Sequence, residues 1–178
     1  MLDDASRRRD FPSLDGMTYL NTAAEGIPPP VVGEALAQYI RDHQIGMDGR
    51  ERHYAQLDAA KQLTARMFGL SAAEVAICSC SSEAYNLAAL ALQLRPGDEV
   101  VINDLDFPAG ATPWLQPSSA ATVKIWRSRA GALRVEDLVP LLGPRTRLVT
   151  ASLVSFYNGF VSYPGPKAPG LVSALSMP

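Results

Sequence analysis

The sequence has little of the features that mark secreted and membrane proteins. Its 178 residues include two cysteines, Cys78 and Cys80, and its formal net charge is −2. No stretch approaches the roughly 18 apolar residues that a membrane-spanning helix needs. Residues 1–10 are charged, and no apolar core of the kind found in a signal peptide follows them. We therefore expect a cytoplasmic protein with no membrane partner.

The sequence is equally poor in basic clusters and metal ligands. Its one basic run, Arg7 to Arg9, lies in a polar terminus, whereas nucleic-acid-binding proteins carry a clustered basic surface. Cys78 and Cys80 on an extended segment would hold their Cα atoms roughly 6.5–7 Å apart, near the upper limit for a disulfide. His43 and His53 show no recognisable metal-ligand spacing. We expect no nucleic-acid partner, no metal site, and two buried, reduced thiols.

What the chain does have is an alternation of helical and extended patterns, which is typical of an α/β protein with a mostly parallel sheet. Apolar spacing and turn residues predict helices over 31–43, 55–68, 83–94 and 135–142, with a further short helix possible over 112–117. Strands are predicted over 74–79, 99–103, 122–127 and 148–153, with a brief strand-like run at 19–21. The length fits one domain, which we divide into an N-terminal arm (1–30), a main body (31–160) and an irregular proline-rich tail (161–178).

The first candidate for chemistry is the junction between the predicted strand 74–79 and the helix that follows it. Ser81 and Ser82 lie in the first turn of that helix, where free N–H groups and the helix dipole favour a phosphate. Simple capping of the helix by serine explains the same residues without any ligand. Neither a Walker lysine nor a glycine-rich dinucleotide fingerprint accompanies the junction.

Two further polar or aromatic segments follow later strands. Residues 104–108 carry two acids and Phe107, and an aromatic side chain there is suited to covering a planar ring. Residues 155–159 bring Ser155 and Asn158 to the same predicted sheet edge. Local core packing of Phe107 and Trp114, and an ordinary Asn-Gly turn after Asn158, are the structural alternatives.

Taken together and in order, these segments resemble the class V aminotransferase family, which includes cysteine desulfurases, selenocysteine lyases, kynureninase and isopenicillin-N-epimerase-like proteins. The resemblance covers residues 14–159. It rests on five segments: 19–24 (YLNTAA), 80–86 (CSSEAYN), 95–101 (RPGDEVV), 106–114 (DFPAGATPW) and 145–159, whose TRLVTASLVSFYNG matches the family pattern TRLVxxSxVSxxxG.

The resemblance implies the fold of a pyridoxal-phosphate (PLP) enzyme of fold type I, here part of its large domain. By the same resemblance, Ser81 and Ser82 hold the PLP phosphate, Phe107 stacks on the pyridine ring, and Ser155 and Asn158 help to line the pocket. The implied partner of the full-length parent is a small-molecule amino-acid substrate, and a possible homodimer is implied because family members usually form one.

The sequence departs from the family beyond Val161. The aspartate in the context VD(A/G)xQ and the Schiff-base lysine in the context (G/S)HKW have no counterpart here. Lys61, Lys124 and Lys167 match neither context, so no catalytic residue is assigned, and we expect a truncated or frame-shifted fragment that is inactive alone. Two alternatives remain open: a non-catalytic α/β remnant, and a binding module for a phosphorylated ligand without preference for PLP.

Overall fold

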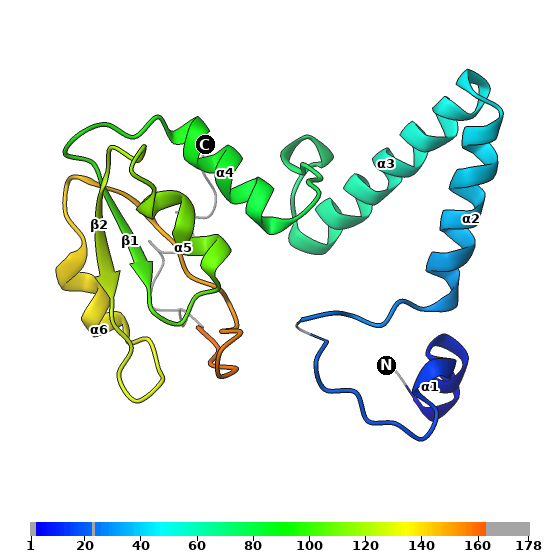
Figure 1. Cartoon of the computed structure of the whole chain (residues 1–178), viewed down its shortest axis with the longest axis horizontal. Helices are drawn as coiled ribbons and strands as arrows, with labels where there is room; N and C mark the ends of the chain where they lie inside the picture. Colours follow the sequence, from blue (N-terminus) through cyan, green and yellow to red (C-terminus); the bar gives the residue numbers. More distant parts are fainter. Residues whose placement is uncertain (1–2, 23, 163–178) are drawn as a thin grey trace. The chain divides into compact units, whose positions relative to one another are not determined.

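The computed structural model of the chain describes residues 3–22 and 24–162 (Figure 1). The chain forms two compact units, Met1–Ile77 and Cys78–Pro178. The division falls inside the segment 31–160, and the predicted domain boundaries stay a prediction. The predicted tail lies almost wholly outside the described residues. Within those residues, no helix is both long and apolar enough to cross a lipid bilayer.

The first unit is helical. It contains α1 (Asp4–Asp10), the 3-10 turn Pro12–Leu14, α2 (Pro30–Gln44), α3 (Met47–Phe68) and the 3-10 turn Ala72–Glu74. Both predicted helices are confirmed, but α3 begins eight residues earlier than expected, because positive φ at Gly46 confines the break to a short turn. Gly49 then lies inside α3, where a Cβ would meet the Asp42 carbonyl oxygen, so α2 and α3 approach closely only because this residue is glycine.

The second unit is built on a parallel sheet, as predicted. Its strands are β1 (Glu99–Asn103), β2 (Thr122–Trp126) and β3 (Thr146–Val149), in the order β2-β1-β3. Both β2 and β3 pair with β1 in parallel. The helices of this unit are α4 (Ser81–Leu92), α5 (Pro108–Leu115), α6 (Val135–Leu138) and the 3-10 turn Val139–Leu141. The sequence-derived α/β class is therefore confirmed.

Side chains along β1 point alternately to the two faces of the sheet, so the core of this unit has two layers. Val100 and Ile102 pack with Trp114 on the face that α4 and α5 cover, while Val101 packs with Leu105, Trp126, Leu133 and Leu138 on the face of α6. All five residues of β1 are buried, as a central strand covered on both faces requires. Figure 1 shows α5 beside β1.

Several local predictions are wrong. Residues 74–79 and 19–21 form no strand, because within the described chain no strand pairs with either segment. Without a sheet around it, the first of these segments leaves its side chains accessible: Cys78 is half-buried and Cys80 exposed, so the expected burial of both thiols is wrong, although both are free. Strand β3 begins two residues before the predicted start and ends at Val149 rather than at residue 153.

Candidate functional site

The order of the strands places a crevice at the carboxyl edge of the sheet. From the central strand β1 the chain passes to β2 on one side and then returns to β3 on the other. In open α/β sheets, ligands bind beyond the carboxyl ends of strands where the direction of winding changes. The loops that follow β1 and β3, residues 104–107 and 150–160, are therefore the part of the fold where a ligand site is expected.

Ser81 and Ser82 begin α4 and are both exposed. No side-chain oxygen caps the helix: its N-cap residue is Cys80. The simple alternative, in which a serine serves as the N-cap, is therefore not what the structure shows. Tyr85, one turn further on, is half-buried, and burial together with the nearby Asp106 carboxylate raises the pKa of its phenol. The start of α4 thus lies beside the loop that follows β1.

The turn before α4 is held by Glu83. Its carboxylate accepts hydrogen bonds from the Ser79 amide at 2.6 Å and from the Ser79 hydroxyl at 2.7 Å. These two bonds lower the pKa of the Glu83 carboxyl. The Glu83 amide and the Ser79 hydroxyl likewise lower the pKa of the Cys80 thiol. The amides at the start of this helix therefore stabilise negative charge, which is the property that a phosphate site requires.

Phe107 comes from the loop after β1 and is 53% exposed. Its ring contacts that of Phe156, from the loop after β3, edge to face with centroids 5.0 Å apart. The core alternative is confirmed for Trp114, which is fully buried with its indole N–H donating to the Gly110 carbonyl, but it is wrong for Phe107. Motif reading gave Phe156 no role, although this residue lies directly after Ser155.

Ser155 and Asn158 both make hydrogen bonds within the chain. The buried Ser155 hydroxyl donates to the Leu105 carbonyl at 2.9 Å, and Asn158 Nδ2 donates to the Gly131 carbonyl at 2.7 Å. The first bond ties the loop after β3 to the loop after β1. The second ties it to the tight turn between β2 and α6. The side chains of these two residues therefore link the loop after β3 to the loops that follow β1 and β2.

Lys124 is not placed to serve this edge. Lys124 Nζ, on β2, pairs with the Glu99 carboxylate at 2.6 Å and donates to the Leu141 carbonyl at 2.9 Å. Because Glu99 is the first residue of β1, this contact lies toward the amino end of the sheet. Lys61 belongs to α3 in the other unit, and Lys167 lies outside the described residues.

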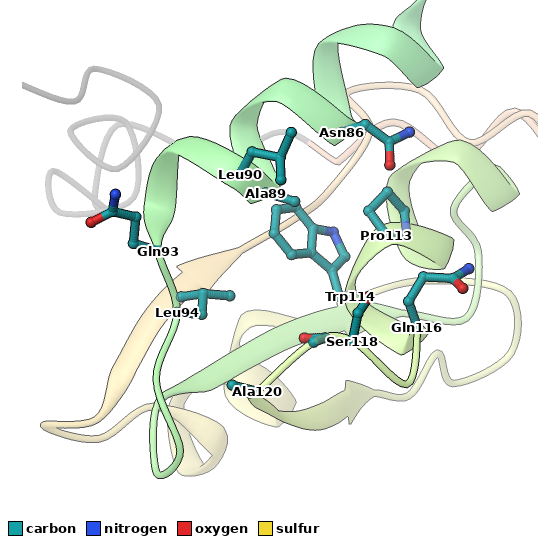
Figure 2. Close-up of a pocket in the computed structure, with 11 residues that line it drawn as sticks. Asn86, Ala89, Leu90, Gln93, Leu94, Pro113, Trp114, Gln116, Ser118 and Ala120 are labelled. Atoms are coloured by element: carbon teal, nitrogen blue, oxygen red, sulfur yellow. The ribbon is translucent and has the colours of Figure 1, made fainter.

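A separate pocket of about 330 Å³ opens between α4 and the end of α5 (Figure 2). Its floor is formed by Trp114, and the side chains around it include Asn86, Leu90, Leu94 and Gln116. None of the predicted site residues lines it, and no charged side chain does so. The pocket is thus distinct from the loops that follow β1 and β3, and it offers no charged partner for an anion.

Comparison with known proteins supports the resemblance drawn from the motifs. A sequence model of the family described as aminotransferase class-V matches residues 18–164. A probable cysteine desulfurase from Mycobacterium leprae is 31% identical over 180 residues, which cover 91% of this chain and 30% of the relative. A probable cysteine desulfurase from Methanothermobacter thermautotrophicus is 29% identical over 165 residues, covering 86% of this chain and 40% of the relative.

The fold is shared with solved structures. One is a variant of C-DES with glycine covalently linked to its PLP cofactor. It aligns with a TM-score of 0.77 at 23% identity, over 86% of this chain and 42% of that chain. The chain spans less than half the length of the relatives described here. The match over residues 18–164 shows that this chain belongs to the class V aminotransferase family.

Proposed function

We propose that the second unit of this chain carries part of a PLP site, with Ser81 and Ser82 holding the phosphate and Phe107 stacking on the pyridine ring. Bound PLP would supply an electron sink for chemistry on an amino-acid substrate. The observation that carries the proposal is the start of α4: two exposed serine hydroxyls in a helical turn without a side-chain cap.

The residues present fit the chemistry of this cofactor. A phosphate is an anion that helix N-terminal amides and hydroxyl donors bind well. The Glu83 amide, in the first turn of α4, is one such donor, and its hydrogen bond lowers the pKa of the Cys80 thiol. A pyridine ring needs an apolar aromatic face, and Phe107 offers one that is half-exposed. We propose that Ser155 and Asn158 contribute by holding the loop beneath this ring.

We further propose that the chain does not by itself complete the reaction. Of its lysines, Lys124 is paired with Glu99 at the other end of the sheet, and none has the sequence context of a Schiff-base lysine. Lyase or transferase activity on an amino acid, a possible homodimer and a cytoplasmic setting are therefore proposed for a longer parent protein. For this chain we propose cofactor binding alone.

The test is a titration of the full chain with PLP, with pyridoxal (the same ring without the phosphate) and with inorganic phosphate. Because two hydroxyls and the helix amides would contact the phosphate, we expect PLP to bind saturably and pyridoxal at least tenfold more weakly (about 1.4 kcal/mol). The double variant Ser81→Ala/Ser82→Ala should lose most of that difference, whereas Ser118→Ala, on an exposed loop, should keep it. Binding of phosphate as tight as that of PLP would instead favour a site for phosphorylated ligands in general. Equal binding of PLP and pyridoxal would contradict the assignment of Ser81 and Ser82.

A further inference from the structure

The two acids of the loop after β1 hold that loop from opposite sides. Asp104 Oδ1 accepts a hydrogen bond from the Ser128 amide at 2.9 Å, just beyond the end of β2. Asp106 instead accepts a hydrogen bond from the hydroxyl of Ser152, which follows β3. Two carboxylates of the same loop, two residues apart, are therefore attached to different neighbours.

Asp106 accepts more hydrogen bonds than Asp104 does. Besides the Ser152 hydroxyl, its Oδ1 atom accepts the Phe107 amide at 3.0 Å, and its Oδ2 atom accepts Asn103 Nδ2 at 3.2 Å. Asn103 is buried and also donates to the Thr150 carbonyl at 3.0 Å. The half-buried Asp106 carboxylate thus accepts hydrogen bonds from three donors. Through them it links the residues that follow β1 to those that follow β3.

These bonds act directly on the aromatic pair. The Phe107 amide belongs to the residue whose ring meets Phe156 edge to face, and Phe156 lies four residues beyond Ser152. Because these bonds fix the backbone of Phe107 and the loop that carries Phe156, they restrict the orientations in which the two rings can meet. Hydrogen bonds to an ionised acceptor are also stronger than bonds between neutral groups.

We propose that Asp106 is a positioning residue, which holds Phe107 against Phe156 so that the Phe107 ring is presented to the pyridine face of PLP. The inference rests on the proposed function for the presence of PLP. Asp106 itself does not touch the cofactor in this account.

The experiment is a double-mutant cycle on the full chain, read by PLP titration. The variant Asp106→Ala should weaken PLP binding by about tenfold, the order expected when hydrogen bonds to a charged group are lost. In a Phe107→Ala background the same change should have little effect, because the ring that Asp106 positions is gone. Asp104→Asn is the matched control: it changes the same charge in the same loop but does not involve Phe107, and it should keep the affinity within about twofold.

Two results would overturn the inference. One is an equal loss from Asp106→Ala with and without Phe107, which would mark a general effect on the fold. The other is unchanged binding by Asp106→Ala with Phe107 present. Should Asp106→Ala fail to fold, as judged by tryptophan fluorescence, Ser152→Ala replaces it in the cycle. Ser152→Ala removes one of the three hydrogen-bond donors to Asp106, and we expect it to weaken PLP binding by about threefold. An equal loss without Phe107, or no loss with Phe107 present, would again overturn the inference.

Failure of the proposed function has a separate signature, since wild-type chain would then bind no PLP. In that case the contact between the Phe107 and Phe156 rings is followed by nuclear Overhauser effects. The inference predicts that the effect between these rings is lost in Asp106→Ala and kept in Asp104→Asn. Retention in both variants would refute the positioning role without any reference to the cofactor.

Discussion

The hydroxyl of Ser155 donates a hydrogen bond to the carbonyl of Leu105, 2.9 Å away and 50 residues earlier in the chain. Both residues are buried, so removing the hydroxyl leaves a carbonyl oxygen without this partner. We expect Ser155→Ala to lower the free energy of unfolding by about 1–3 kcal/mol. Urea unfolding followed by tryptophan fluorescence measures it, with the exposed Ser118→Ala as control. Equal midpoints for the two variants would show that the bond contributes nothing.

The turn that Asn158 contacts depends on a glycine. Gly131 has φ +76°, and a Cβ at this position would come within 2.9 Å of Asn158 Nδ2. We expect Gly131→Ala to destabilise the chain by about 1–2 kcal/mol, because an L residue is strained at this φ. The measurement is urea unfolding, with Gly143→Ala as a control at a position where a Cβ meets nothing within 4 Å. In the Asn158→Ala background the cost should fall, since the clash is removed. A cost unchanged in that background would locate the whole effect in the backbone.

The thiol of Cys80 should be unusually reactive for a cysteine. The Glu83 amide first, and then the Ser79 hydroxyl, lower its pKa, and the side chain is exposed. Because the thiolate is the nucleophile, its alkylation should reach half its maximal rate at a pH below that of a free cysteine, which is about 8.5. Iodoacetamide labelling of a Cys78→Ser chain, followed across pH, measures it. The same chain in urea provides the control, and identical profiles for folded and unfolded chain would contradict the prediction.

Stability should fall in acid partly through Glu99. Hydrogen bonding to Lys124, followed by that to Arg145, lowers the pKa of this buried carboxyl below its ordinary value. Its contribution is therefore fully present above the unfolded pKa, about 4.3, and is lost as the pH falls through the lower folded value. We expect the urea midpoint of wild type to drop more steeply below pH 5 than that of Glu99→Gln. The exposed Glu136→Gln should behave as wild type. Parallel curves for wild type and Glu99→Gln would rule out this contribution.

The sequence predicted best where local pattern and tertiary packing agree. Strand β1 was located to the residue, because a run of buried β-branched residues between a turn and an acidic loop has one reading. Residues 74–79 carry an equally apolar pattern, but a strand also needs a partner, and none is present among the described residues. Strand identity depends on such long-range pairing, which a local window does not contain.

The same limit applies to the site. Motif order placed Phe107 after β1 and Ser155 after β3, and it placed Ser81 in the first turn of a helix, although the strand expected before that helix is not formed. It did not reveal that Asp106 joins Ser152, or that Phe156 meets Phe107, since these contacts cross about fifty residues of chain. The two acids of the loop were visible as residue types, but their partners became identifiable only from the fold.

The central claim is that this chain binds PLP through Ser81, Ser82 and Phe107 without a Schiff-base lysine of its own. The most direct test loads the full chain with PLP, reduces it with borohydride, and maps the peptides by mass. We predict saturable uptake that gel filtration reverses before reduction, with no stoichiometric pyridoxyl adduct on Lys61, Lys124 or Lys167. A stoichiometric adduct on one of these lysines, or no saturable uptake at all, would contradict the account.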